Sequence, residues 1–90
     1  MIVETNKAVP TIKKFIDYIQ QAINTMKSDY IDLNAGDIHR KLGGYPGKNH
    51  RMPTCCNAMR KFMVPKDIVI YQPLKGNGAS LTIRYFKRIK

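Results

Sequence analysis

The stretch GGYPGKNHRMPTCCNAMRKFM, residues 43–63, divides into a turn and a helix. The two glycines and the Tyr-Pro-Gly that open it are turn formers, because glycine adopts left-handed backbone angles and proline fixes φ. Pro53 suits the first turn of a helix, where its missing N–H would have no partner in any case. We predict a helix from Pro53 to about Val64, ended by Pro65. Its core positions are expected to be Cys55 or Cys56, Met59, Phe62 and Met63, with the remaining surface holding Thr54, Asn57, Ala58, Arg60 and Lys61.

The chain before this stretch carries a second helical pattern, which starts at Pro10. Apolar residues recur there at spacings of three and four over about four turns, the period of one helix face. The other face carries lysine, aspartate, glutamine and asparagine. We therefore predict an amphipathic scaffold helix whose core stripe comprises Ile12, Phe15, Ile16, Ile19, Ile23 and Met26.

A short strand and a short helix are predicted between these two helices. Tyr30–Leu33 alternates polar and apolar residues, which indicates a short strand or an extended link. Asn34 is suited to cap a helix, and Asp37 then lies in its first turn, where a carboxylate complements the helix dipole. We expect Ile38 and Leu42 to face inward, and the glycine pair that follows to end the helix after about two turns.

Two strands are predicted after the third helix. Ile68–Tyr71 is rich in β-branched residues, and Leu81–Phe86 alternates with a period of two. The segment between them, residues 72–80, contains two glycines and a proline. We therefore predict an antiparallel hairpin closed by this loop.

The predicted order is helix, short strand, helix, turn, helix, strand, loop, strand, which is an α+β domain. Over residues 10–87 this order resembles the winged-helix variant of the helix-turn-helix fold, a three-helix bundle with a short strand and a C-terminal β-hairpin wing. Two runs, NAGDIHRKLGGYPGKNHRMPTCC at 34–56 and KGNGASLTIRYF at 75–86, resemble small bacterial and phage domains of that class, some of them linked to restriction or nuclease chains. The resemblance implies the fold and no settled activity.

Ninety residues make one small domain, which we assign to residues 1–90 with an ordered core at about 10–87. No run of eighteen apolar residues occurs, so we expect no membrane span and no membrane partner. The first ten residues, MIVETNKAVP, lack the apolar stretch of a secretion signal. We therefore expect a cytoplasmic protein whose two cysteines are thiols, and the resemblance implies that the cell is a bacterium or a phage-infected host.

The net charge is strongly positive and unevenly placed. Sixteen Lys and Arg against six Asp and Glu give +10. Residues 38–90 hold twelve of the bases and one acid, Asp67, for a net +11. Such segregation destabilises a compact chain by self-repulsion and favours a polyanionic partner. We expect nucleic acid as that partner, and the alternatives are solubility alone or an acidic protein.

Four potential metal ligands lie close in the sequence: His39, His50, Cys55 and Cys56. Structural zinc sites space their ligands so that the donors converge, whereas adjacent residues on a helix point about 100° apart. One of the cysteines is more simply a core residue. A histidine-and-metal nuclease would need further acids, and after residue 37 there is only one. We expect no metal, no cofactor, no small-molecule substrate and no enzymatic activity.

For contact with duplex DNA, the predicted third helix offers two side chains that can recognise a base. The amide of Asn57 can pair with adenine and the guanidinium of Arg60 with guanine, while Thr54 lies at the helix start, where N–H groups can donate to a phosphate. In a winged helix the hairpin loop reaches a neighbouring backbone or the minor groove. The predicted binding residues are Lys48, Asn49, His50, Arg51, Thr54, Asn57, Arg60, Lys61, Lys75, Asn77 and Arg84.

A protein with this surface would be a transcription regulator or the targeting module of a larger assembly. The alternative is a phage or bacterial protein that binds and inhibits, or recruits, a nucleic-acid-handling enzyme through the same basic surface. RNA binding is a third, weaker reading of the same charge.

Overall fold

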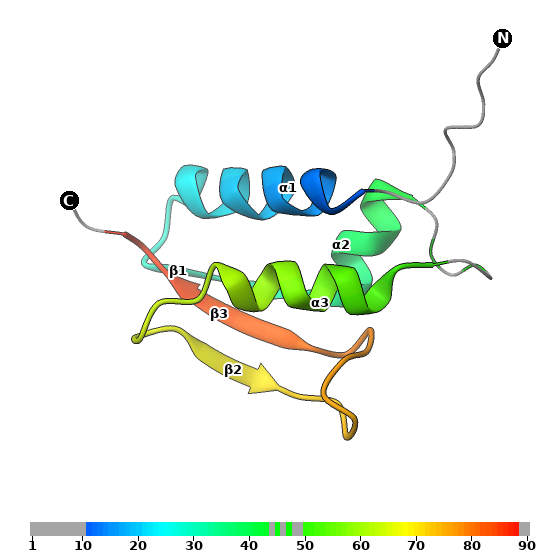
Figure 1. Ribbon diagram of the computed structural model, residues 1–90. Helices are drawn as coiled ribbons and strands as arrows, with labels where there is room; N and C mark the ends of the chain where they lie inside the picture. Colours follow the sequence, from blue (N-terminus) through cyan, green and yellow to red (C-terminus); the bar gives the residue numbers. More distant parts are fainter. Residues whose placement is uncertain (1–10, 44, 46, 48–49, 89–90) are drawn as a thin grey trace, which may run out of the picture.

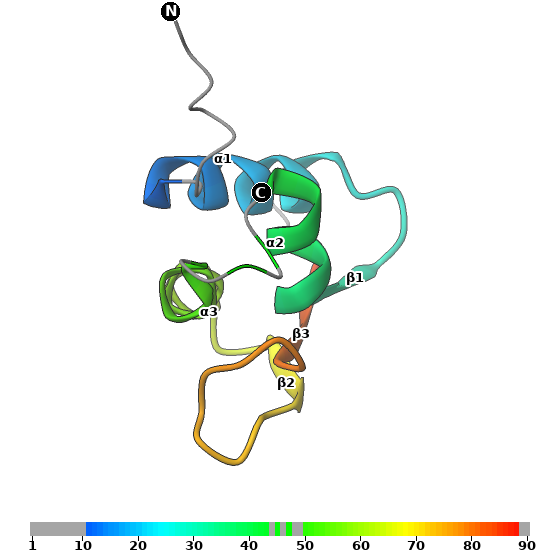
Figure 2. The same cartoon turned by 90° about the vertical axis from the view of Figure 1, so that its right-hand side faces the viewer.

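The computed structural model describes residues 11–43, 45, 47 and 50–88 (Figure 1). They form three helices and one antiparallel sheet of three strands, which confirms the predicted α+β class. The helices lie together on one side of the sheet (Figures 1 and 2). None of the described helices is long and apolar enough to cross a bilayer. The elements follow in the order α1 (Ile12–Thr25), β1 (Tyr30–Asn34), α2 (Ala35–Leu42), α3 (Met52–Lys61), β2 (Ile68–Tyr71) and β3 (Thr82–Phe86).

The sheet has β3 at its centre, in the order β1-β3-β2. β2 and β3 pair antiparallel with Ile68 opposite Arg84, so the predicted hairpin is confirmed, with a bulge towards the loop. β1 pairs with the other side of β3 along its length, with Tyr30 opposite Phe86. The Tyr30–Leu33 segment is therefore a strand rather than a link. The backbone of the segment pairs with β3, and the alternation of side chains along a strand places Leu33 in the core.

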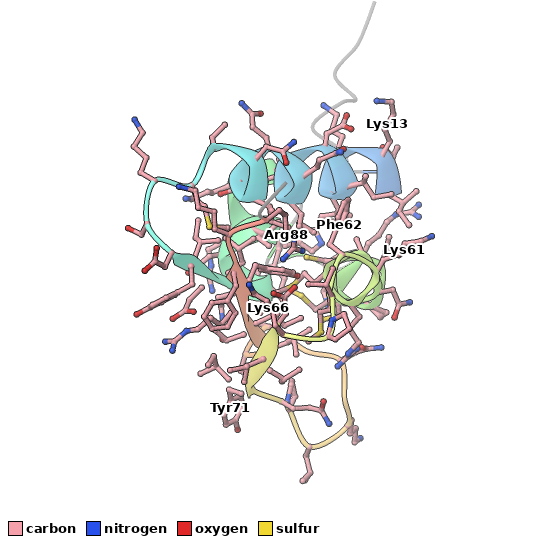
Figure 3. The ribbon with its side chains drawn as sticks, turned by 90° about the vertical axis from the view of Figure 1, so that its left-hand side faces the viewer. Lys13, Lys61, Phe62, Lys66, Tyr71 and Arg88 are labelled. Carbon is pink, nitrogen blue, oxygen red and sulfur yellow. The ribbon has the colours of Figure 1, made fainter. Side chains whose placement is uncertain are left out.

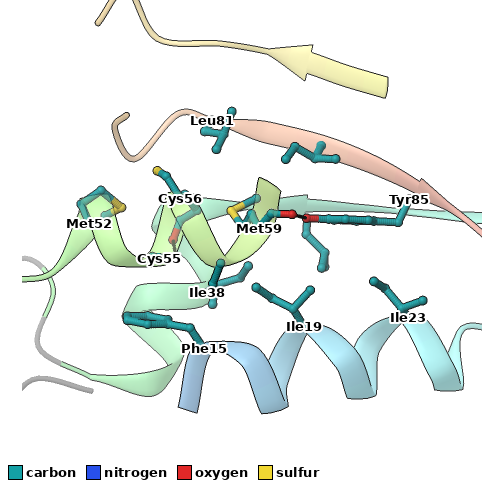
Figure 4. Packing of buried hydrophobic residues seen from close by; sticks show 14 residues of the cluster. Phe15, Ile19, Ile23, Ile38, Met52, Cys55, Cys56, Met59, Leu81 and Tyr85 are labelled. Atoms are coloured by element: carbon teal, nitrogen blue, oxygen red, sulfur yellow. Dashed lines mark hydrogen bonds between the residues drawn. The ribbon is translucent and has the colours of Figure 1, made fainter. Parts of the chain in front are cut away.

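The core lies between α1, α3 and the sheet (Figure 4). Phe15, Ile19 and Ile23 of α1 are buried, as the helical stripe predicts. Ile12, at the first position of α1, lies beyond this packing and is 46% exposed, which corrects the prediction for that residue. On the sheet side, Tyr85 is buried and its O–H donates to the carbonyl of Met59 at 2.6 Å, which satisfies the hydroxyl inside the core. The two remaining residues of the predicted stripe, Ile16 and Met26, are half-buried.

The boundaries of α2 confirm the predicted caps. Oδ1 of Asn34 accepts the N–H of Asp37 at 3.0 Å, the bond expected of an N-cap asparagine. Gly43 ends the helix with φ of 103°, a left-handed value that favours glycine, and its N–H donates to the carbonyl of His39 at 2.9 Å. Asn34 also donates from its amide to the hydroxyl of Thr82, which ties the start of α2 to the sheet.

α3 differs from the prediction at its ends. It begins at Met52, with Pro53 in its first turn, and it ends at Lys61 rather than at about Val64. The last turn tightens, because the N–H of Phe62 donates three residues back to the carbonyl of Met59.

The buried face of α3 is also wider than predicted. Both Cys55 and Cys56 are fully buried, not one of them, and Ala58, which we expected at the surface, is buried as well. The reason is that α3 is covered on two sides. The thiol of Cys55 points at the carbonyl of Ala35 in α2, whereas the thiol of Cys56 points at the carbonyl of Gly78 in the loop between β2 and β3.

Candidate nucleic-acid interface

The outward side of α3 is polar and carries no acid. Asn57 and Lys61, one turn apart, are both exposed, and Thr54 is half-buried one turn earlier. Figure 3 shows Lys61 projecting from α3 away from the core. None of the described elements covers this side, because the buried residues of α3 all lie on the opposite part of the helix. Three of the predicted contact residues are therefore brought together on one helix face.

The start of α3 adds a cation and a histidine. Arg51, the N-cap residue, is exposed. His50 is exposed too, but its Nδ1 accepts the N–H of Met52 at 3.2 Å, so part of this ring caps the helix. Lys48 and Asn49, which we also predicted as contact residues, lie outside the described residues.

A buried histidine fixes the connection between α2 and α3. Nδ1 of His39 lies 3.0 Å from the carbonyl oxygen of Gly43, and its Nε2 lies 2.9 Å from the backbone nitrogen of Arg51. The carbonyl can only accept and the amide can only donate, so the geometry assigns a neutral ring with its proton on Nδ1. Phe15 meets the ring edge-on at 5.1 Å, and Tyr45 lies at 5.5 Å. This residue, considered as a metal ligand from the sequence, has a structural role.

The loop between β2 and β3 reaches α3 through Arg60. Nη1 of Arg60 donates to Oδ1 of Asn77 at 2.6 Å, and Nη2 donates to the carbonyl of Gly76. Lys75 lies next to these acceptors and is exposed. The structure thus brings three predicted residues of α3 and the loop together, but Arg60 is engaged by the loop instead of projecting freely from the helix.

Arg84 lies elsewhere. Side chains of β3 alternate, so Ile83 and Tyr85 face the helices and Arg84 faces the outer side of the sheet. Its guanidinium donates twice to the carboxylate of Asp32, at 2.8 and 3.0 Å, and lies over the ring of Tyr30 at 4.0 Å. The hydrogen bonds from Arg84 lower the pKa of Asp32, against an opposing effect of burial. The structure therefore does not group Arg84 with α3.

The single acid of residues 38–90 is used inside the fold. The carboxylate of Asp67 is buried and accepts the N–H groups of Val64 at 3.0 Å and Phe86 at 2.9 Å, together with Arg88 at 3.1 Å. Burial alone would raise the pKa of Asp67, but these donors outweigh it and hold the pKa below its ordinary value. Arg88 is accordingly anchored in the fold (Figure 3), one residue beyond the predicted end of the ordered core at about residue 87.

The two cysteines are buried thiols. Burial raises the pKa of the Cys55 thiol to about 12 and also raises that of Cys56. Both are therefore protonated at neutral pH, and the thiol form is a poor nucleophile and a poor metal ligand. Within residues 11–43, 45, 47 and 50–88, no three His, Cys, Asp or Glu side chains are placed to hold a metal ion.

Comparison with known proteins does not extend this description. No protein-family model matches the chain, and no curated protein and no solved structure is significantly similar to it.

Proposed function

We propose that this protein is a winged-helix protein that binds duplex DNA, with α3 in the major groove and the β2–β3 loop beside it on the DNA backbone. The order of the elements supports the assignment, since α3 directly precedes a hairpin whose second strand pairs with β1. The size of α3 also fits. An α-helix with its side chains is about 10–12 Å across, and the major groove is about 12 Å wide.

One observation carries the proposal: α3 and the loop present cations that no carboxylate of their own segment offsets. Arg51, Lys61 and Lys75 are exposed and form no ion pair within the described part of the chain. The only acid between residues 38 and 90 is Asp67, which is buried and paired with Arg88. A surface of this kind attracts a polyanion, and double-stranded DNA carries one negative charge per about 1.7 Å of axis.

The remaining polar residues of α3 suit recognition of bases. Asn57 is exposed at the middle of the outward side, where its amide could pair with adenine. Thr54 lies one turn nearer the helix start, close to N–H groups that can donate to a phosphate. A module of this type would serve as a transcription regulator or would direct a larger assembly to DNA.

The test is a salt series with the full chain. Binding to random-sequence duplexes is measured by fluorescence anisotropy, and log affinity should fall with log salt at a slope near −4.5 if about five phosphates are contacted. Replacing Arg51, Lys61 and Lys75 by alanine should make this slope less negative by about 2.7, which corresponds to three lost contacts.

A matched variant controls for net charge. Lys14, Lys27 and Lys87 are exposed lysines outside α3 and the loop, with no ion pair among the described residues. Their replacement by alanine removes the same charge and should leave the slope nearly unchanged. Equal losses in the two triple variants would show that charge, and not this surface, determines binding.

Binding to a protein is the second candidate, and an exposed apolar group favours it. Leu74 in the loop is 100% exposed beside Lys75, and Ile68, Ile70 and Tyr71 of β2 are each about half exposed. Apolar side chains next to a cation suit a protein partner with an acidic rim. Purification after nuclease treatment separates the two candidates. A stoichiometric protein that stays bound favours this one, whereas absorbance at 260 nm that disappears favours DNA.

A further inference from the structure

Arg60 holds two acceptors of one loop at the same time. Its Nη1 donates to the side chain of Asn77 and its Nη2 to the carbonyl of Gly76. Hydrogen bonds from a charged guanidinium are the stronger kind, and a two-nitrogen grip also fixes direction. A residue whose position on α3 suggests contact with guanine is thus committed to the protein itself.

The loop is shaped to bring its acceptors to this place. The N–H of Gly76 donates to the carbonyl of Pro73 at 2.8 Å, which closes a turn around Leu74 and Lys75. Gly76 has φ of 88°, a backbone angle that favours glycine, although a side chain there would meet no atom within 4 Å. The backbone conformation at position 76, and not a lack of space, therefore favours glycine there. The carbonyl of this same residue is one of the two acceptors that Arg60 holds.

The base of the loop has separate attachments. The N–H groups of Ala35 and Gly36 donate to the carbonyls of Leu81 and Ala79, each at 2.9 Å. A Cβ on Gly36 would lie 3.0 Å from the oxygen of Ala79, so this approach is close. These contacts hold residues 79–81 to α2, while the tip at residues 73–77 depends on the turn and on Arg60.

We propose that Arg60 is a positioning residue that holds the tip of the β2–β3 loop against α3 and so sets the place of Lys75 relative to Asn57 and Lys61. The consequence for DNA rests on the proposed function. Arg60 then affects DNA binding indirectly, through the position of the loop. With the loop held in advance, less conformational entropy is lost when Lys75 meets a phosphate. Base recognition falls to Asn57, and a guanine contact by Arg60 is not expected.

The first arm of the test needs no DNA. Amide hydrogen exchange is measured residue by residue in the wild type and in Arg60→Ala, Arg60→Lys and Asn77→Ala. The Gly76 amide should exchange about tenfold faster in Arg60→Ala, and Asn77→Ala should act in the same direction. Arg60→Lys keeps the positive charge but lacks the planar guanidinium that donates to two acceptors at once. The Gly76 amide should therefore lose most of its protection from exchange in this variant as well. The Gly36 amide, bound to the loop base, is the internal reference and should not change. Unchanged exchange at Gly76 in all three variants would overturn the proposal.

The second arm uses a pool of random-sequence duplexes about two helical turns long (~21 bp). Lys75→Ala should weaken binding about fivefold at 0.1 M salt in the wild type. In the Arg60→Ala background, Lys75→Ala should weaken binding almost no further, because the loop that carries Lys75 is already displaced. Lys61→Ala is the control, and its effect should multiply with that of Lys75→Ala.

Base preference distinguishes positioning from direct recognition. Duplexes selected from the pool by Arg60→Ala should show the same base preferences as those selected by the wild type. Loss of a guanine preference, with the full effect of Lys75→Ala retained, would show that Arg60 contacts a base and would refute the inference. If the wild type binds no duplex, the proposed function fails, and the exchange measurements still decide whether Arg60 holds the loop.

Discussion

Replacing Asp67 by asparagine should destabilise the protein strongly. The carboxylate is fully buried and receives two backbone N–H groups and the guanidinium of Arg88. Asparagine keeps one acceptor oxygen and presents an N–H2 group to donors that need an acceptor, while Arg88 loses its counter-charge. Because Arg88 is 30% exposed, water recovers part of that loss. We expect the free energy of unfolding to fall by about 2–4 kcal/mol, a large part of the ~5–15 kcal/mol of a small domain.

Urea denaturation followed by circular dichroism at pH 7 measures this loss. The matched control is Asp17→Asn, because Asp17 pairs with Lys13 at 2.9 Å on the exposed surface of α1. That variant should lose only about 0.3–0.5 kcal/mol. A cost for Asp67→Asn no greater than that of the control would refute the reasoning.

The same variant should change how stability depends on pH. The pKa of Asp67 is lower in the folded protein than in the unfolded chain, where an aspartate titrates near 3.9. The stability that it contributes is therefore complete above the unfolded pKa and is lost as pH falls through the folded pKa. Below about pH 4 the wild type should lose stability more steeply than Asp67→Asn. Asp32, whose pKa is also lowered, leaves both proteins a residual dependence in the same direction. Parallel curves would contradict the assignment.

Three further outcomes test the packing around α3. His39→Ala removes both hydrogen bonds of the ring and its packing, and it should lower the free energy of unfolding by about 3 kcal/mol in urea denaturation. Gly36→Ala places a Cβ 3.0 Å from the carbonyl oxygen of Ala79, so it should destabilise by about 1–3 kcal/mol despite the better helix propensity of alanine. Cys55 and Cys56 should resist iodoacetamide at pH 8 in the native protein and react in urea, as mass spectrometry would show, because both thiols are buried and protonated.

Most predictions that depend on neighbouring residues are confirmed, and the exceptions are Ile12, which is exposed, and the end of α3, which lies at Lys61. The stripe of α1 follows from helical periodicity, the cap at Asn34 from one side chain three residues from its donor, and the β2–β3 hairpin from two alternating runs around a glycine-rich loop. Each of these is decided within one element or between adjacent elements, so the sequence contains the relevant partners side by side.

Packing on more than one side could not be derived in this way. α3 lies against α1 and α2 and also against the β2–β3 loop, which lies below α3 in Figure 2, so Ala58 and both cysteines are buried. Helical periodicity describes one core-facing stripe and does not reveal a second covering element. The pairing of β1 with β3, with Asn34 opposite Thr82, joins residues 48 apart in sequence and has no local signal.

The basic surface was predicted only in part for the same reason. The sequence shows where cations are concentrated but not which of them are paired. Arg84 is neutralised by Asp32 at a separation of 52 residues, and Arg60 is held by Asn77 at a separation of 17. The glycine-rich loop was a signal that a backbone carbonyl could approach α3 closely, but no local pattern identified Arg60 as the side chain that meets it.

One side chain, His39, spans the whole spacer between α2 and α3 by joining the carbonyl of Gly43 to the N–H of Arg51. His39 thus ties the start of α3 to the end of α2, in addition to the packing of α3 against α1 and α2. Insertions or exchanged segments between these two residues should leave the tilt of α3 unchanged as long as the imidazole remains. Under the proposed function, lysines added to this spacer should strengthen the electrostatic attraction to DNA without changing α3 itself.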